Sequence, residues 1–163
     1  MDEFWLCVRL LLLLAVANGG PIVAKRVFGT RWNAPLDFGL MFFDGRPLLG
    51  ASKTVRGFVV AVLLTAAAGA LLGLGWQLGA MVGAFSMLGD ALSSFVKRRL
   101  NIASSGRATG IDQIPEALLP MLVARAGLGL SLLEVMAITV VFFALEIPLA
   151  RLFFRLRLRD RPY

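Results

Sequence analysis

The stretch Met87-Leu-Gly-Asp-Ala-Leu-Ser-Ser-Phe-Val-Lys-Arg-Arg-Leu100 places a carboxylate inside an apolar run that ends in three consecutive cations. An ionisable side chain in a membrane span is costly, and by default it indicates a functional site. Small and polar residues recur here at steps of three or four, so they share one face of a helix: Gly79, Gly83, Ser86, Asp90, Ser94 and Lys97. Lys97 follows Asp90 by roughly 10 Å along the helix axis. The carboxylate is therefore expected below the water interface but within reach of it.

The composition predicts an all-α integral membrane protein with one polytopic domain over residues 1–163. Hydrophobic residues make up 58% of the chain, against roughly 45–50% in soluble domains. Histidine is absent and Cys7 is the single cysteine, which excludes histidine chemistry, a disulfide framework and a cysteine zinc cluster. The remaining carboxylates, cations and hydroxyls suit Mg²⁺ and a phosphate substrate. The net charge of +7 does not indicate nucleic acid, because the hydropathy requires a bilayer.

About five apolar segments are expected to cross the membrane. They cover residues 4–17 (with an extension to residue 24), 55–76, 77–96, 114–126 and 132–152. Gly69 and Gly73 form a GxxxG pair that allows close helix approach. Ser131-Leu-Leu-Glu134 is typical of a capping box at the start of the last segment.

The basic residues indicate the orientation. Fifteen of the 17 Lys and Arg residues fall in the first long loop and the start of the second span, in the loop after the third span, and at the C-terminal end. They are Lys25, Arg26, Arg31, Arg46, Lys53, Arg56, Lys97, Arg98, Arg99, Arg107, Arg151, Arg155, Arg157, Arg159 and Arg161. Five spans put all three segments on one side, which the positive-inside rule makes cytoplasmic. We therefore expect a multi-pass protein of the cytoplasmic membrane with its N-terminus outside, its C-terminus inside, and cytoplasmic loops 21–54 and 97–113 that contribute to the active site.

The first loop carries the motif Phe43-Asp-Gly-Arg-Pro-Leu-Leu-Gly-Ala-Ser-Lys-Thr-Val-Arg-Gly57. Lys53, Thr54 and Arg56 cluster where a helix is expected to begin. Backbone amides at a helix N-terminus, together with Lys and Arg, form a cradle for phosphate. The spacing is not that of a Walker A loop. The alternative is a cationic membrane anchor that contains a turn.

Two carboxylates are candidate metal ligands. Asp90 has a structural alternative, in which it pairs with Lys53 or Lys97 on a helix-packing face. The second candidate, Asp112, lies in Gly110-Ile-Asp-Gln-Ile-Pro-Glu116. It equally fits a helix N-cap with Pro115 in the first turn.

Taken together, these motifs resemble the CDP-archaeol synthase family, a relative of the CTP:phosphatidate cytidylyltransferases. The resemblance extends from Asn18-Gly-Gly-Pro21 to about Pro120 and rests on many matches in the same order. The matching residues are Asn18, Gly19, Asp37, Phe38, Gly39, Asp44, Gly45, Arg46, Gly50, Lys53, Thr54, Arg56, Gly57, Gly89, Asp90, Ser94, Phe95, Lys97, Arg98, Arg99, Asp112 and Gln113. Ala51-Ser52 and Pro115-Glu116 depart from the archaeal pattern, which favours a bacterial-type member and leaves a phosphatidic-acid-like lipid open beside an archaeal ether lipid.

The resemblance implies a membrane enzyme that converts CTP and a lipid phosphate to a CDP-lipid and pyrophosphate. Asp90 and Asp112 are then the expected Mg²⁺ ligands, with Asp44 as a possible helper. The expected catalytic residues are Asp90, Asp112, Lys53 and Lys97. The expected substrate-binding residues are Asp44, Arg46, Thr54, Arg56, Ser94, Arg98 and Gln113.

Two other kinds of membrane protein share some of these features. A small transporter or lipid-binding membrane protein would also carry a polar stripe, but it would release no pyrophosphate. A CDP-alcohol phosphotransferase needs an Asp-Gly-x-x-Ala-Arg motif, and the sequence after Asp44-Gly45 does not follow that pattern.

Overall fold

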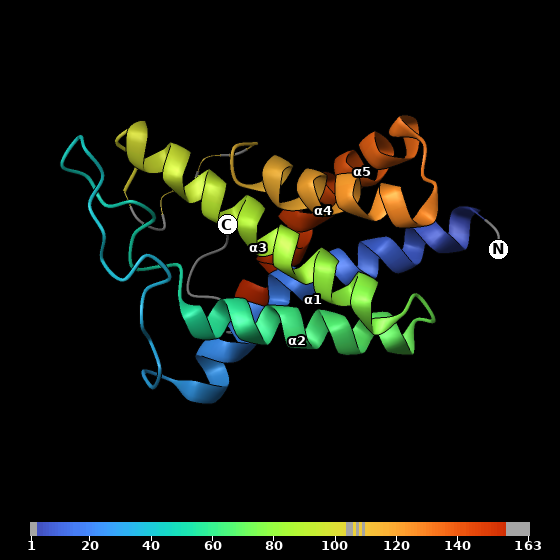
Figure 1. Ribbon diagram of the computed structural model, residues 1–163, viewed down its shortest axis with the longest axis horizontal. Coiled ribbons are helices and arrows are strands. Elements are labelled where there is room, and N and C mark those ends of the chain that lie inside the picture. Colours follow the sequence, from blue (N-terminus) through green and yellow to red (C-terminus); the bar gives the residue numbers. More distant parts are fainter. Residues whose placement is uncertain (1–2, 104–105, 107, 109, 156–163) are drawn as a thin grey trace.

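Five helices form the protein in the computed structural model, which describes residues 3–103, 106, 108 and 110–155, without the side chains of 147 and 149–155. They are α1 (Glu3–Phe28), α2 (Val55–Leu71), α3 (Trp76–Arg99), α4 (Gln113–Leu128) and α5 (Leu132–Arg155). The helices run side by side as a bundle, and the long loop between α1 and α2 extends beyond one end of it (Figure 1). The all-helical prediction is confirmed, and so is the start of a helix directly after Lys53 and Thr54.

Two helix ends differ from the expected boundaries. α2 stops at Leu71 rather than at residue 76, because Gly73 and Gly75 adopt φ angles of +72° and +87° that end a helix. Trp76 consequently begins α3. α1 continues past residue 24 to Phe28 with Pro21 inside it, and it ends where Gly29 turns with φ +56°.

Glycines bring neighbouring helices close together. A Cβ on Gly20 would lie 2.5 Å from the Cα of Ala61, and one on Gly69 would lie 2.8 Å from the Cα of Gly79. The prediction of close approach is therefore confirmed at Gly69. It is wrong for Gly73, which lies in the turn after α2.

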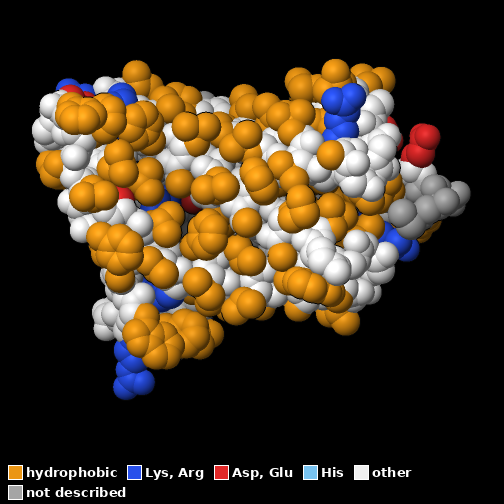
Figure 2. Space-filling model, viewed as in Figure 1, with side chains coloured by type: hydrophobic (Ala, Val, Ile, Leu, Met, Phe, Trp, Pro, Cys, Tyr) orange, Lys and Arg blue, Asp and Glu red, His pale blue; other side chains and the backbone are white. Residues whose placement is uncertain are grey.

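The buried core joins four of the helices. Leu10, Leu13 and Leu14 of α1 meet Val82 of α3 and Met121 of α4, together with residues of α5. Many large apolar side chains remain on the outside of the bundle, and Figure 2 shows a mostly apolar face over the helices. α1 and α3 are long and apolar enough to cross a membrane. Membrane crossing by α2, α4 and α5 stays a prediction.

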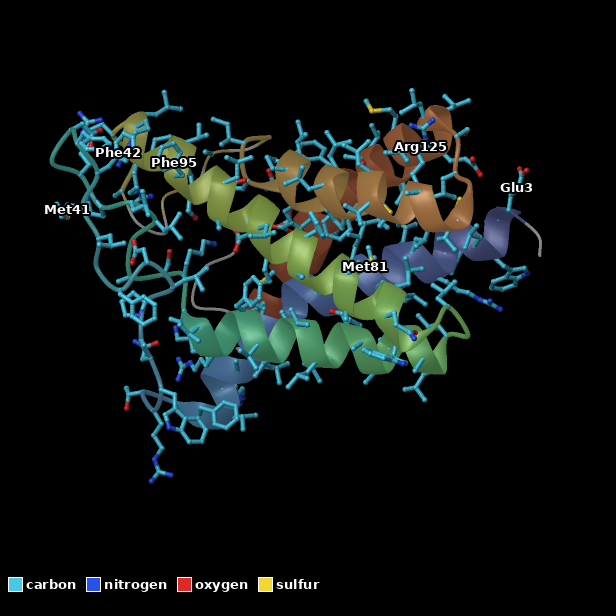
Figure 3. All side chains as sticks on the ribbon, in the orientation of Figure 1. Glu3, Met41, Phe42, Met81, Phe95 and Arg125 are labelled. Carbon is cyan, nitrogen blue, oxygen red and sulfur yellow. The ribbon has the colours of Figure 1, made fainter. Side chains whose placement is uncertain are left out.

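The two ends of the bundle carry different residues. The long loop and the C-terminal end of α3 lie together at one end, whereas Glu3 and Arg125 lie towards the other (Figure 3). The capping box that begins α5 is confirmed, since Ser131 N donates to Glu134 Oε2 and Glu134 N donates back to Ser131 Oγ. Several cations of the orientation argument lie outside the described residues or side chains: Arg107, Arg151, Arg155, Arg157, Arg159 and Arg161.

Candidate active site

The loop before α2 delivers an ammonium group to the carboxylate on α3. Lys53 Nζ lies 2.5 Å from Asp90 Oδ2, and both side chains are about one-fifth exposed. Of the two partners that the sequence left open for Asp90, the structure therefore selects Lys53, and Lys97 pairs with Asp112 instead. The tertiary fold therefore brings together two predicted site residues that are 37 positions apart in the chain.

The backbone around Lys53 is held by the start of the same loop. Leu36 N donates to Lys53 O at 2.7 Å, and Val55 N donates to Ala34 O at 3.0 Å. Thr54 is the N-cap of α2, and its Oγ1 accepts a hydrogen bond from Gly57 N. Thr54 Oγ1 thus stabilises the helix start that fixes Lys53, and its predicted substrate contact stays a prediction.

Asp37 organises the loop from inside. Its carboxylate accepts hydrogen bonds from the backbone N–H groups of Gly39, Leu49 and Gly50, and the residue is 5% exposed. Burial alone would raise the pKa of Asp37, but the hydrogen bonds from Gly50, Leu49 and Gly39 outweigh burial and lower that pKa. Asp37 therefore remains a carboxylate that ties both arms of the loop together.

The second predicted carboxylate forms a second ion pair. Lys97 Nζ lies 2.6 Å from Asp112 Oδ1, and Lys97 also donates to Gly106 O. Asp112 stands at the N-cap position of α4, but its side chain makes no capping hydrogen bond. Asp112 Oδ2 instead accepts from Ala108 N. The prediction that Asp112 occupies the N-cap position is therefore confirmed, but its side chain does not cap the helix.

The residues next to the two carboxylates form a tight contact between α3 and α4, since Gly89 directly precedes Asp90 and Pro115 follows Asp112 by three residues. A Cβ on Gly89 would approach Pro115 O to 2.2 Å. Ser93 Oγ donates to Gly89 O at 2.9 Å, and it lies 3.4 Å from Asp112 O. Ser93 therefore connects the helical turn that carries Asp90 to the backbone of the second carboxylate.

Three further predicted residues lie in the C-terminal part of α3 and at the start of α4. Arg98 is buried and donates to Ala103 O. Ser94 is 2% exposed on α3. Gln113 accepts from Gly110 N through Oε1. Their roles in substrate binding stay predictions.

Two arginines that were predicted to bind substrate face backbone carbonyls. Arg56 donates to Gly29 O, Arg31 O and Asn33 Oδ1, at the end of α1 and in the loop that follows it. Arg46 donates to carbonyls at the C-terminal end of α3. In this structure both guanidinium groups hold the loop in place, and their contact with phosphate stays a prediction.

The candidate helper Asp44 also serves the loop. Its Oδ1 accepts from Arg46 N and lies 3.1 Å from Arg99 Nη1. Arg99 and Asp37 matched the family motif without being predicted as site residues, and Ser93 was not singled out. The signal for Asp37 was its position directly before Phe38-Gly39, a sequence typical of a turn closed by a carboxylate.

The donor set fits a magnesium ion that shares its coordination with a nucleotide. Among the described residues, no group of three His, Cys, Asp or Glu side chains could hold a metal. Mg²⁺ in nucleotide sites is usually held by one or two carboxylates plus phosphate oxygens and water. Asp90 and Asp112 supply two such carboxylates, and Asp112 Oδ1 meets Lys97 without hydrogen-bond geometry. The two lysines supply cations for phosphate oxygens.

Comparisons with known proteins agree on one family. The family model CarS-like, described as CDP-archaeol synthase, matches residues 5–78 and 72–163. A CDP-archaeol synthase of Sulfurisphaera tokodaii is 35% identical over 156 residues, which cover 91% of this chain and 89% of that protein. A CDP-archaeol synthase of Methanopyrus kandleri is 44% identical over 90 residues, covering 49% of this chain and 50% of that protein.

A solved structure has the same fold. It is described as an intramembrane enzyme for archaeal membrane lipid biosynthesis, and it matches with a TM-score of 0.71 and 30% identity over 86% of this chain and 90% of that one. The relatives named above are archaeal, so they give no support to the bacterial-type expectation.

Proposed function

Because this chain belongs to the CDP-archaeol synthase family, we propose that its Lys53–Asp90 and Lys97–Asp112 pairs form the active site of a membrane cytidylyltransferase. The enzyme joins the cytidylyl group of CTP to a lipid phosphate. An oxygen of the lipid phosphate bonds to the α-phosphorus of CTP, the bond from that phosphorus to the bridging oxygen breaks, and pyrophosphate leaves. The observation that carries the site is the contact between Lys53 and Asp90 across two distant segments.

The chain's own residues supply charge and orientation in this reaction. A lipid phosphate is already an anionic nucleophile, so the transfer needs no strong general base. It needs neutralisation of several negative charges and in-line placement of the reacting groups. Lys53 and Lys97 each hold an ammonium against a carboxylate, and both can turn that ammonium to phosphate oxygens when the nucleotide enters.

We assign the two carboxylates, Asp90 and Asp112, to Mg²⁺. When bound, the ion supplies charge stabilisation at the triphosphate oxygens. Asp90 lies on α3 and Asp112 at the entry to α4, so the contact between these helices at Gly89 fixes both ligands. Ser93 adds to this by joining Gly89 O to the backbone of Asp112.

The lipid substrate is proposed to be the unsaturated archaeal ether-lipid phosphate. Support comes from the names of the archaeal relatives and from the apolar outer surface of the helices, along which isoprenoid chains can lie while the phosphate meets CTP at the bundle end. A phosphatidic-acid-type lipid is the comparison substrate in the test below.

The experiment is a cytidylyl-transfer assay on purified protein in detergent with Mg²⁺, α-labelled CTP, and either lipid phosphate. We expect label to enter the lipid phase, faster with the ether lipid, and pyrophosphate to appear in equal amount. Asp90→Asn keeps the size of the side chain and removes its charge. It should reduce transfer to background while the protein keeps its helix content.

Each contrary result removes a defined part of the proposal. Wild-type turnover in Asp90→Asn would remove Asp90 from the metal site. Equal or faster transfer to phosphatidic acid would reject the ether-lipid assignment. Saturable lipid binding by folded protein without pyrophosphate release would favour the non-enzymatic lipid-binding alternative.

A further inference from the structure

The first loop folds into a tight hairpin at its tip. Phe42 N donates to Arg46 O at 2.8 Å, and Leu48 N donates to Leu40 O at 2.8 Å. Asp44 Oδ1 accepts from Arg46 N and closes the turn between them. The hairpin lies beyond the helix ends, at the C-terminal end of α3 (Figure 1).

From this hairpin Arg46 reaches the end of α3. Its Nη1 lies 2.7 Å from Arg99 O and 3.3 Å from Arg98 O. The last carbonyls of a helix have no partner within the helix and carry the negative end of its dipole. Arg46 therefore caps a helix that ends more than fifty residues later in the chain.

Arg99 makes the reciprocal contact from the helix to the hairpin. Its Nη2 donates to Pro47 O at 2.7 Å, and its Nη1 pairs with Asp44. The guanidinium also lies over the ring of Phe42 at 4.6 Å and over that of Phe95 at 4.9 Å. The two rings meet edge to face, one from the loop and one from α3 (Figure 3).

We call Arg46 and Arg99, with Asp44, Phe42 and Phe95, the arginine latch. The latch connects to Lys53 along the loop, whose backbone is held by hydrogen bonds to Asp37 and from Leu36. Asp37 accepts from Leu49 N and Gly50 N, just after the hairpin, and Leu36 N donates to Lys53 O. The loop is thus fixed to α3 at two places. One is the helix end at Arg99, and the other is Asp90, nine residues or roughly 13 Å earlier along the axis.

We propose that Arg46 and Arg99 are positioning residues, and that the latch they form sets Lys53 against the triphosphate without contacting phosphate itself. This inference rests on the proposed function. Both guanidinium groups donate to backbone carbonyls of the opposite element, so their donors are directed at the loop–helix junction. The proposal assigns Arg46 and Asp44 a positioning role, where the sequence predicts direct contact with the substrate.

The test is a double-mutant cycle with Lys53. Arg99→Ala and Arg46→Ala are made in the wild-type protein and in Lys53→Ala, and kcat and KM for CTP are measured in the transfer assay. In the wild-type background each latch variant should lower kcat/KM for CTP about tenfold, the size expected for residues coupled through shared contacts. In the Lys53→Ala background the same change should cost less than about twofold, because the residue that it positions is gone.

A conservative variant separates charge from geometry. Lysine keeps the positive charge but loses the planar, bidentate and stacking properties of arginine. Arg99→Lys should therefore behave like Arg99→Ala. Restoration of wild-type kcat/KM by Arg99→Lys, or additive losses in the cycle, would overturn the latch and support direct attraction of phosphate.

Hydrogen exchange gives a readout that does not depend on turnover. Amides of residues 48–53 should exchange faster in Arg99→Ala than in wild type, because the loop loses one of its two attachments. Arg31→Ala is the matched control, since the side chain of this exposed arginine in the same loop makes no hydrogen bond or ion pair with the described residues. Unchanged exchange in Arg99→Ala would overturn the latch, whether or not the wild type transfers the cytidylyl group. Absence of transfer by the wild type would reject only the proposed function.

Discussion

Asp112 has the position of a helix cap in the sequence, but its side chain has another role. The residue occupies the N-cap site of α4, yet its carboxylate faces Ala108 N and Lys97 rather than the first turn of its own helix. A capping side chain contributes typically about 1 kcal/mol of stability, and Asp112 does not make that hydrogen bond. Its charge is therefore available to Lys97 and, in the proposed function, to Mg²⁺.

The variant Asp112→Asn separates the two roles. Asparagine keeps an oxygen that can accept from Ala108 N, so the loop before α4 should hold and the thermal midpoint in detergent should fall by only a few degrees. Cytidylyl transfer should drop at least about a hundredfold, since removal of one electrostatic group at a reacting centre commonly costs that much. A large fall in the thermal midpoint with transfer preserved would assign Asp112 to structure alone.

The sequence identified both carboxylates and two candidate partners for Asp90, Lys53 and Lys97, but it did not decide between them. Spacing along a helix relates only residues of the same helix, so it placed Lys97 on the face of Asp90 and gave no position for Lys53. The actual partner, Lys53, is 37 positions away, and its place depends on the path of the whole first loop. The same limit explains why Arg46 was predicted to bind substrate and Arg56 to bind phosphate. The sequence does not show which groups the side chain of an arginine contacts, and here both arginines donate to backbone carbonyls.

At the scale of elements, the contact of α3 with α4 depends on one missing side chain. Gly89→Ala would place a Cβ 2.2 Å from Pro115 O and 2.5 Å from Pro115 C, both backbone atoms. The helices must then move apart, and overpacking of this kind costs roughly 1–3 kcal/mol. We expect a lower thermal midpoint and reduced transfer, because Asp90 directly follows Gly89 and Asp112 lies three residues before Pro115.

Gly127→Ala is the matched control within α4. Nothing lies within 4 Å of its added Cβ, and alanine is the better helix former by about 1 kcal/mol. Its thermal midpoint should equal or exceed that of wild type, with normal transfer. If the two variants have equal midpoints, close packing at Gly89 does not limit stability.

The first loop should show its own pH dependence through Asp37. Because the pKa of Asp37 is lowered in the folded state by three backbone N–H donors, its ionised form stabilises the fold at pH values above its usual pKa of about 3.9. That contribution is lost as the pH falls through the lowered pKa. The thermal midpoint of wild type should exceed that of Asp37→Asn by a constant amount from about pH 5 to 7, and the difference should shrink below about pH 4. A difference independent of pH would show that the carboxylate charge is not what holds the loop.

Helix existence was predictable and helix ends were less so. The apolar runs and the basic residues that follow them predicted five helices, and all five appear among the described residues. The end of α2 was missed because Leu71 to Trp76 is apolar throughout, and only the left-handed backbone of Gly73 and Gly75 interrupts it. Hydropathy does not report backbone conformation, so the pattern continued through the turn.

At the scale of the whole molecule, the orientation proposed from charge agrees with the arrangement of the bundle. The loop that carries Lys53 and the cationic end of α3 lie at one end, and Arg125 lies towards the other (Figure 3). The predicted orientation places this end in the cytoplasm, where CTP is available. Five crossings with an outside N-terminus require the α1–α2 loop and the α4–α5 turn to face opposite sides of the membrane.

Cysteine labelling tests that requirement directly. With Cys7→Ala as background, Leu133→Cys places a thiol at a residue that is 79% exposed at the start of α5, and Arg31→Cys places one in the exposed first loop. A membrane-impermeant maleimide applied to intact cells should label Leu133→Cys at once, and it should label Arg31→Cys only after permeabilisation. Cys7→Ala itself must give no label in either condition. Labelling of Arg31→Cys in intact cells would invert the orientation and put Lys53 outside the cell. Labelling of both positions from the same side would instead change the number of crossings between them, because an odd number of spans is what separates the two loops.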